Sequence, residues 1–279
     1  MKVVILSKDE SEKAKEILYG LRFEGIPVQA VVSEIRKEIP LTPARIVQKI
    51  REYSFGQLCR KGLGKALRLP SRDVPKLNKN ETRAISLSAY SQKEGAAYFR
   101  VPDLNGAESI DLLKQLAPDL LILGGTGIIR RGLLDIPRIG TVNAHMGLLP
   151  KYRGMNVTEW SVFNGDPVGV TVHFVDEGVD TGEILYREVI DVKDCPSIER
   201  LRAKVSRRQH QILAECIRMF IDGKGPLPIH QEISEGKQYY AMHERLKERV
   251  EEKLHRMFVR GEAAQRRQTA GNFCSSGGR

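Results

Sequence analysis

The sequence has few aromatic residues and lacks paired cysteines and long apolar runs. It has 279 residues, of which 6% are aromatic, one is tryptophan and four are cysteine. The cysteines (Cys59, Cys195, Cys216 and Cys274) form no CxxC pair, which disfavours a zinc site and predicts a reducing compartment. No apolar run approaches the ~18 residues of a membrane span, and the N-terminus does not have the pattern of a signal peptide. We therefore expect a cytoplasmic protein with no membrane association.

Two nucleotide-binding motifs are also missing. The turn SKDESE at 7–12 contains no GxGxxG, so a dinucleotide site there is not expected. The glycine-rich turn at 124–134, GGTGIIRRGLL, lacks the Lys–Ser/Thr ending of a P-loop. No Ser-His-Asp or Cys-His arrangement supplies a nucleophile, and no metal-binding pattern is present. The glycines nonetheless let backbone N–H groups approach a ligand closely.

The positive charge is unevenly distributed along the chain. The net charge is +10, and residues 35–83 hold 13 Lys/Arg against 4 Asp/Glu. Residues 236–279 hold 10 against 5, so these two segments carry +14 and the remainder carries −4. The charges are dispersed and lack interleaved aromatics, so we interpret them mainly as a solvated surface. Binding of nucleic acid is the alternative from a different class, although no recognisable RNA-binding module is present.

The order of apolar segments predicts an α/β fold. A strand at 2–7, a helix at 8–23 and a strand at 28–32 form a βαβ opening. Further strands are expected at 97–101, 119–123, 168–175 and 183–192, with helices at 107–116, 156–163, 197–221 and 239–258. Asn105 or Ser109 is expected to cap the helix at 107–116. Two basic helices, at 43–53 and 55–68, are expected within the basic insertion 35–83.

Three polar residues are placed to act together. Asn143 and His145 are two apart, so they project from one face of an extended strand. The β-rich run at 168–175 ends in a loop that contains Asp180. An amide, an imidazole and a carboxylate can thus converge at the ends of two strands, and this set can polarise a carbonyl and move protons. His173 is only a candidate for a residue that supports these three side chains without acting directly.

These residues belong to a longer pattern that resembles the 10-formyltetrahydrofolate-dependent formyltransferases. The pattern is Asn-x-His at 143–145, LLPKYRG at 148–154, GVTVH at 169–173 and DEGVDTG at 176–182. That family includes methionyl-tRNA, glycinamide ribonucleotide and amino-sugar formyltransferases. The strongest part of the resemblance covers 119–185, and the joint pattern is much more specific than any of its parts.

The resemblance implies a Rossmann-like domain with a mostly parallel twisted sheet, flanking helices and a short helical C-terminal extension. We expect residues 1–222 to be the catalytic domain, including the basic insertion 35–83. Residues 223–259 would be a linker and helical extension, and residues 260–279 a disordered tail. The stripe on the last helix permits a homodimer.

The resemblance also implies roles for individual residues. Asn143 and His145 would hold the formyl oxygen as it becomes an oxyanion, and Asp180 would take part in proton transfer. The co-substrate would be 10-formyltetrahydrofolate, with no metal. Its binding residues would be Gly125, Gly127, Ile128, Ile129, Leu149, Pro150, Val175, Asp176, Glu177 and Gly178. Tyr152, Arg153, Glu159 and Trp160 are candidates on the side of the acceptor amine.

The sequence departs from the family at positions that bear on the acceptor. Gly147 stands where many members have Ser, and RGMNVTEW at 153–160 lacks the proline of tRNA-directed members. Only 57 residues follow Asp222, where tRNA enzymes carry a β-barrel. We therefore expect a small-molecule amine as acceptor, preferably a nucleotide-linked amino sugar. Methionyl-tRNA, glycinamide ribonucleotide and water (hydrolysis of formyltetrahydrofolate) stay open as alternatives.

Overall fold

The computed structural model describes residues 1–35 and 85–275, with side chains described as far as Val259. The two basic helices expected at 43–53 and 55–68 lie outside the described residues. The same holds for nearly all of the basic insertion 35–83.

The main sheet contains seven described strands. They are β1 (Val3–Lys8), β2 (Ala30–Glu34), β3 (Ala97–Val101), β4 (Leu120–Gly124), β5 (Gly140–His145), β7 (Gly169–Phe174) and β8 (Ile184–Val189). Their spatial order is β3–β2–β1–β4–β5–β7–β8. Strands β3, β2, β1, β4 and β5 run parallel to one another. Strand β7 is antiparallel to both of its neighbours, β5 and β8. The predicted α/β fold with a mostly parallel sheet is confirmed.

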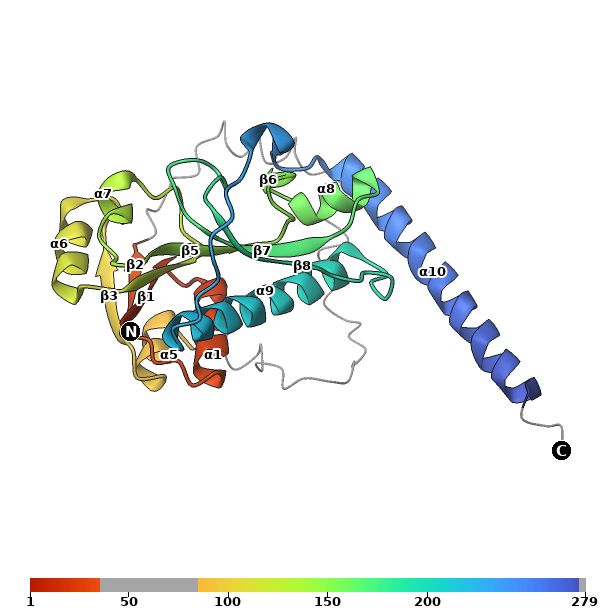
Figure 1. Ribbon diagram of the computed structural model, residues 1–279, viewed down its shortest axis with the longest axis horizontal. Coiled ribbons are helices and arrows are strands. Elements are labelled where there is room, and N and C mark those ends of the chain that lie inside the picture. Colours follow the sequence, from red (N-terminus) through yellow and green to blue (C-terminus); the bar gives the residue numbers. More distant parts are fainter. Residues whose placement is uncertain (36–84, 276–279) are drawn as a thin grey trace, which may run out of the picture.

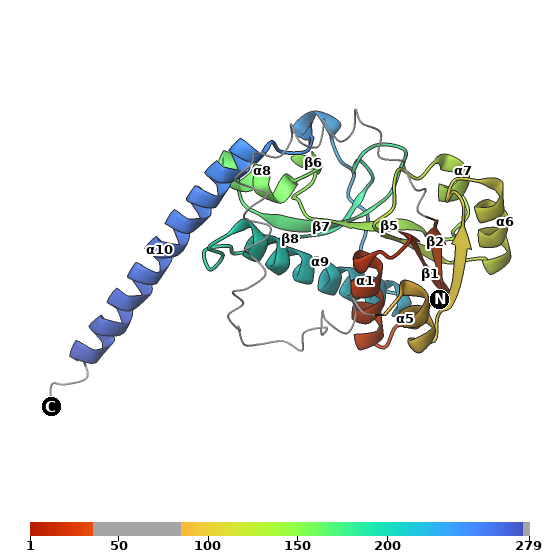
Figure 2. The ribbon, with the colours of Figure 1, turned by 180° about the vertical axis from the view of Figure 1, so that it is seen from behind.

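Helices flank the sheet on both faces (Figures 1 and 2). The described helices are α1 (Glu12–Phe23), α5 (Leu87–Lys93), α6 (Ala107–Leu116), α7 (Arg131–Leu134), α8 (Val157–Asn164), α9 (Ile198–Ile221) and α10 (Glu244–Ser275). Helices α1, α5 and α9 lie on one face, and α6 and α7 pack on the other. Helix α10 starts beside α8 and runs away from the body.

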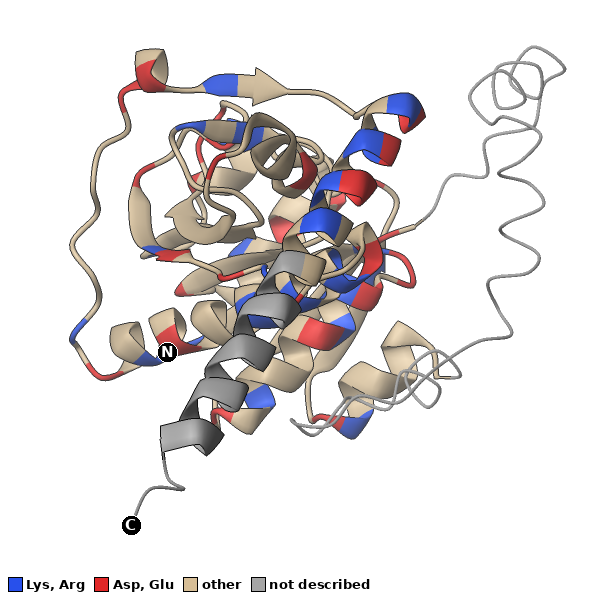
Figure 3. Cartoon of the chain, turned by 90° about the vertical axis from the view of Figure 1, so that its right-hand side faces the viewer, with Lys and Arg blue, Asp and Glu red and all other residues tan. Residues whose placement is uncertain are grey.

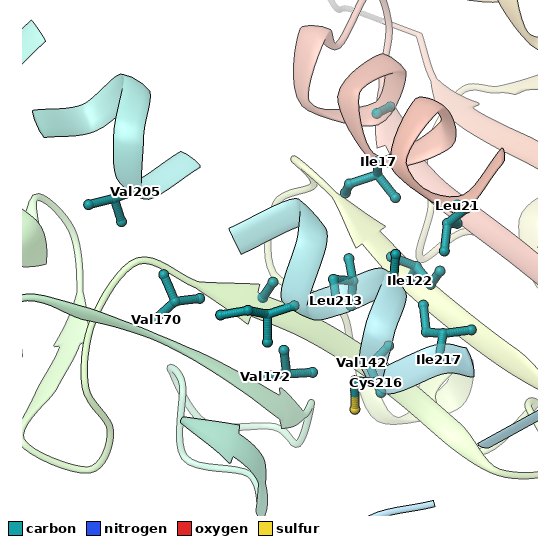
Figure 4. Close-up of a cluster of buried hydrophobic side chains, with 14 of the residues drawn as sticks. Ile17, Leu21, Ile122, Val142, Val170, Val172, Val205, Leu213, Cys216 and Ile217 are labelled. Carbon is teal, nitrogen blue, oxygen red and sulfur yellow. The ribbon is translucent and has the colours of Figure 1, made fainter. Parts of the chain in front are cut away.

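The larger hydrophobic core lies between the sheet on one side and helices α1 and α9 on the other (Figure 4). Leu213 and Ile217 of α9 meet Val142 and Val172 of the sheet, and all four are almost fully buried. Burying each such side chain contributes about 1.5–3 kcal/mol. Met242, Val250 and Leu254 belong to the same core. The C-terminal extension is therefore packed onto the sheet domain at its start.

Local sequence explains several helix starts. Ser11 caps α1, where its hydroxyl accepts a hydrogen bond from the N–H of Ala14, and Ser197 caps α9 in the same way. Neither Asn105 nor Ser109 caps α6, which begins after Gly106 without a side-chain cap. The side chain of Asn105 is instead bonded to the backbone of Ile128 and Arg130, 3.0 and 2.8 Å away. It thus supports the glycine-rich turn.

The C-terminal helix differs from its expected bounds. Tyr239 lies in β9 (Lys237–Tyr239), which pairs with β6 (Tyr152–Gly154) in a separate two-stranded sheet. Helix α10 begins at Glu244 and continues to Ser275, through much of the tail that was expected to be disordered. The run of Ala, Gln and Arg at 263–268 favours helix, which outweighs the polar composition.

The described surface offers no obvious membrane or metal feature. Basic and acidic side chains alternate along the first half of α10 (Figure 3), as expected for a solvated helix. Within residues 1–35 and 85–275, no helix is long and apolar enough to cross a membrane. No group of His, Cys, Asp and Glu side chains in the same ranges could hold a metal ion.

Candidate active site

The polar residues of β5 project from the sheet face opposite α9. Val142 and Ala144 point into the core beneath α9, so the alternation of a strand places Asn143 and His145 on the other face. In the neighbouring strand β7, His173 lies directly opposite Asn143. The strand pairing therefore creates a polar cluster, which Asp180 completes from the loop after β7. We call Asn143, His145, His173 and Asp180 the polar cluster.

His145 is held between two oxygen atoms. Its Nε2 lies 2.8 Å from the backbone oxygen of Tyr152, and its Nδ1 lies 3.4 Å from Oδ2 of Asp180. A proton on either ring nitrogen therefore has an acceptor. Burial lowers the pKa of His145, while the carboxylate of Asp180 opposes that shift. An oxygen of a bound substrate would have to share or replace the contact to Tyr152 in order to reach Nε2.

Asp180 is fixed by contacts on both carboxylate oxygens. Oδ2 accepts a 2.9 Å hydrogen bond from the N–H of Gly154, and Oδ1 lies 3.5 Å from Nε2 of His173. Burial raises the pKa of Asp180, but His173, His145 and the Gly154 N–H together hold that pKa well below its ordinary value. Asp180 also has a φ of 54°, a left-handed conformation that few non-glycine residues adopt, although Asp adopts it more readily than most. Its placement is therefore imposed by the surrounding contacts.

His173 is more central than the sequence indicated. It is 2% exposed, and its Nδ1 donates to the backbone oxygen of Phe174 at 2.7 Å. Its Nε2 lies 3.3 Å from Nδ2 of Asn143 and 3.5 Å from Oδ1 of Asp180, so this nitrogen can accept from the amide or, when it carries a proton, donate to the carboxylate. His173 thereby orients Asn143 and contacts Asp180. The signal that could have revealed it is the antiparallel pairing of β5 and β7, which was not predicted.

Gly147 makes room for the contact of His145 with Tyr152. A Cβ atom at residue 147 would lie 2.8 Å from Nε2 of His145, 2.8 Å from the oxygen of Tyr152 and 2.9 Å from Val157. No Cβ is accommodated at such distances without movement of its neighbours. The glycine that departs from the family pattern therefore matches the local geometry of this chain.

The residues predicted to bind the co-substrate come mainly from two loops. Gly125, Gly127, Ile128 and Ile129 follow β4, and the other loop, which contains Val175, Asp176, Glu177 and Gly178, follows β7. Ile129 and Val175 belong to one hydrophobic cluster, so the two loops meet on the sheet face that carries the polar cluster. The side chain of Ile128 is 75% exposed. Gly125 has a φ of 91°, which favours glycine.

The remaining co-substrate candidates have internal roles in the loops. Asp176 Oδ1 accepts hydrogen bonds from the N–H of Gly178 and the hydroxyl of Thr181, at 3.1 and 2.6 Å. Leu149 is buried, and its N–H donates to Thr171 Oγ1 at 3.1 Å. Pro150 is partly buried and Glu177 is exposed. Asp176 therefore shapes the loop that presents Asp180.

A pocket of about 480 Å³ opens at the carboxyl end of β5. Asn143, His145 and Gly154 belong to its lining, and the N–H of Gly154 donates to Asp180. The rest of its lining comes from β5, α1, α8, α9 and the residues beside α8, namely Lys13, Glu16, Ala144, Met146, Asn156, Val157, Thr158, Glu159, Arg202, Ser206 and Gln209. None of the loop residues predicted to bind co-substrate belongs to this lining. Of the polar cluster, Asn143 and His145 line the pocket.

One of the four acceptor-side candidates lines the pocket. Glu159 is buried there and forms an ion pair with Arg202. Tyr152, Arg153 and Trp160 instead contact residues 229–240, which we call the brace segment. The Tyr152 ring stacks on Tyr239 at 5.0 Å, Arg153 Nη2 donates to the backbone oxygens of residues 233 and 236 at 3.2 Å each, and Trp160 Nε1 donates to that of residue 240 at 3.0 Å.

The brace segment also supports the loop of Asp180. Gln231 is 3% exposed, and its Nε2 donates to the backbone oxygens of Asp180, at 3.4 Å, and Gly182. Strand β9 of the same segment pairs with β6, whose Gly154 donates to the Asp180 carboxylate. Gln231 was not singled out from the sequence, because its partners are backbone atoms about 50 residues away. The brace segment thus holds the loop of Asp180 from outside the sheet.

Comparison with known proteins supplies the classification. A family model described as formyl transferase matches residues 66–217, which is more than half of the chain. The chain belongs to the formyl transferase family. All of the polar cluster lies inside the matched range.

Among individual formyl transferases, the similar curated sequences are methionyl-tRNA formyltransferases. That of Clostridioides difficile is 34% identical over 131 residues, which is 46% of this chain and 42% of the relative. That of Methylacidiphilum infernorum is 35% identical over 130 residues, or 46% and 41% of the two chains. The chain thus spans about half the length of the curated relatives that it matches.

Solved structures of formyl transferases share the fold. Glycinamide ribonucleotide transformylase 1 from Symbiobacterium toebii has a TM-score of 0.54 at 20% identity, covering 83% of this chain and 94% of that one. Phosphoribosylglycinamide formyltransferase from Streptococcus pneumoniae has a TM-score of 0.52 at 17% identity, covering 79% and 98%. The predicted Rossmann-like architecture is confirmed by this likeness.

Proposed function

We propose that the protein transfers a formyl group from 10-formyltetrahydrofolate to a primary amine. The observation that carries this proposal is the placement of Asn143, His145 and Asp180. His145 contacts Asp180 at 3.4 Å, and His173 lies between Asn143 and the same carboxylate. Asn143 and His145 also line a pocket, within a chain of the formyl transferase family. The same three residues are the ones that the motif pattern assigns to catalysis.

Each catalytic residue has a distinct task in this proposal. The Asn143 amide has two N–H donors, of which one contacts His173, so the other is available to an oxygen that becomes negative. His145 adds a polarised imidazole beside that oxygen. A donor of this kind accelerates acyl transfer by about 10²–10³-fold. Asp180 would accept the proton that the attacking amine loses, directly or through a water molecule, and deliver it to the co-substrate nitrogen as its bond to the formyl carbon breaks.

The co-substrate is proposed to lie between the loops that follow β4 and β7. When bound, 10-formyltetrahydrofolate supplies the formyl carbon and the leaving nitrogen. The loops fit such a ligand because their glycines expose backbone groups and because Ile128 presents an exposed apolar side chain. Gly125, Gly127, Ile128, Ile129, Val175, Asp176, Glu177 and Gly178 would hold the pterin, with Leu149 and Pro150 at its edge.

The proposed acceptor is a small molecule, with a nucleotide-linked amino sugar preferred. The pocket has a volume in the range of small-ligand sites, and its polar lining (Asn156, Thr158, Ser206 and Gln209) offers partners for hydroxyl groups. Glu159 and Arg202 add a charged pair at the wall. The second candidate acceptor is methionyl-tRNA, because the similar curated sequences carry that name.

The decisive experiment is a screen of amines with 10-formyltetrahydrofolate, with tetrahydrofolate release as the readout. Nucleotide-linked amino sugars, glycinamide ribonucleotide and methionyl-tRNA would be compared with a reaction that contains no amine. Release only in the presence of an amine identifies transfer and its acceptor. Release at the same rate without any amine would mean hydrolysis, and no release in any reaction would contradict the proposal.

The cellular setting stays a prediction. A cytoplasmic location and a possible homodimer rest on the sequence.

Two cysteines in the described part of the chain, Cys195 and Cys216, are free and buried. Burial raises the pKa of each thiol to about 12, so neither is reactive at neutral pH.

A further inference from the structure

Lys13 stands out among the charged residues of the pocket. It is the second residue of α1, where the positive end of the helix dipole disfavours a cation. Its Nζ reaches the backbone oxygen of Ala144, between Asn143 and His145, at 3.5 Å. Helix stability therefore does not explain a lysine here, whereas its position beside the polar cluster points to a role in binding.

The other charged side chains that line the pocket are satisfied by neighbours. Glu159 pairs with Arg202, and Glu16 lies 3.2 Å from Nδ1 of His210 and accepts from Ser206 at 3.3 Å. Lys13 has no carboxylate within 4.0 Å among the described residues. Its one hydrogen bond there is the long contact to Ala144. The Lys13 ammonium thus keeps donors available.

The contact to Ala144 does not need Lys13. The side-chain amide of Gln209 donates to the same backbone oxygen from α9, and Gln209 is 2% exposed. That oxygen would therefore remain hydrogen-bonded if Lys13 were replaced. Burial lowers the pKa of Lys13, and the carboxylates of Asp180 and Glu16, which lie beyond ion-pair distance, only partly oppose that shift. An anionic partner in the pocket would supply a closer counter-charge.

We propose that Lys13 recognises a carboxylate or phosphate group located a few bonds from the reacting amine of the acceptor. The inference rests on the proposed function and narrows its acceptor class to anionic amines. We place the anionic group close to the amine because Lys13 reaches the backbone oxygen of Ala144. Ala144 lies in β5 between Asn143 and His145, the two proposed catalytic residues. A neutral acceptor would leave the ammonium with no described carboxylate within 4.0 Å.

The direct test is an anion titration that needs no turnover. Lysine-labelled protein would be titrated with acetate and, separately, with inorganic phosphate, and the side-chain resonances followed by NMR. We expect one of the two anions to bind saturably to the wild type and to Lys114→Met, an exposed control on α6. Lys13→Met should bind it roughly thirtyfold more weakly, because a buried charge pair loses one partner. Lys13→Gln serves if Lys13→Met does not fold.

Either of two titration results would overturn the inference: equal binding by wild type and Lys13→Met, or no saturable binding of either anion. The anion that binds distinguishes a carboxylate from a phosphate. A kinetic arm compares glycine with glycinamide and O-phosphoethanolamine with ethanolamine as formyl acceptors. Lys13→Met should raise KM for the anionic member of each pair by a much larger factor than KM for the neutral member. If no amine in the wider screen is formylated, the proposed function fails while the titration still decides the role of Lys13.

Discussion

The polar cluster and the brace segment differ in how they contribute to the same site. Members of the polar cluster contact one another through side chains, within 3.3–3.5 Å across β5, β7 and the loop after β7. The brace segment takes part mainly through its own backbone oxygens. These accept hydrogen bonds from the side chains of Arg153 and Trp160 and from the N–H of Met155. The contribution of the polar cluster therefore depends on the type of each side chain, whereas that of the brace segment depends on where its backbone lies.

The largest expected effect is a loss of kcat without loss of the fold when Asp180 is replaced. Asp180→Asn keeps an acceptor for the Gly154 N–H but removes the negative charge beside His145. We expect kcat to fall by about 10²–10⁴-fold, the usual contribution of a positioned proton-transfer group. Tetrahydrofolate release in single-turnover reactions measures this, and circular dichroism checks the fold. A variant within threefold of wild-type kcat would remove Asp180 from the mechanism.

A smaller, indirect effect is expected from the brace segment. Arg153→Met removes two hydrogen bonds to backbone oxygens of that segment and should lower the free energy of unfolding by about 2 kcal/mol. The Asp180 loop then loses support, so kcat should fall roughly tenfold. Urea unfolding and steady-state kinetics measure both quantities. Arg138→Met, which loses an exposed ion pair to Asp119, is the matched control and should change neither. Loss of stability with unchanged kcat would uncouple the brace segment from catalysis.

The smallest expected effect concerns stability at low pH. The folded-state pKa of Asp180 is lowered, so its stabilising contribution is complete above its unfolded pKa of about 4. That contribution is lost as the pH falls toward the folded pKa. The free energy of unfolding of the wild type should therefore decrease more steeply below about pH 4 than that of Asp180→Asn. Parallel pH profiles for the two proteins would show that Asp180 is not stabilised by its neighbours in the folded state.

The sequence predicted the fold and the centre of the site better than their surroundings. The strands at 97–101 and 119–123 and the helix at 107–116 follow from apolar periodicity, and the structure has them within one residue. Asn143, His145 and Asp180 come together as the motif pattern implied, although their catalytic roles stay predictions. The convergence could be predicted because strand alternation and one short loop determine it.

The supporting contacts could not be predicted in the same way. Gln231 and the brace segment act through backbone atoms distant in sequence, which leave no pattern of residue types. Tyr152 and Arg153 within LLPKYRG and Trp160 within RGMNVTEW are predicted from the motifs as acceptor residues. Their partners in residues 233–240 become visible only when β6 pairs with β9. The role of Gly147 depends on distances to three atoms from separate segments.

Trp160 gives the molecule a built-in optical reporter. It is the single tryptophan of the chain, its indole N–H is bonded to residue 240, and its ring lies 5.3 Å from that of Tyr239. Emission excited selectively at the indole therefore monitors the attachment of the brace segment and does not average over the molecule. Detachment would expose the indole to water and shift its emission to longer wavelength while the sheet is still intact. Local opening next to the loop of Asp180 can thus be followed in unlabelled protein.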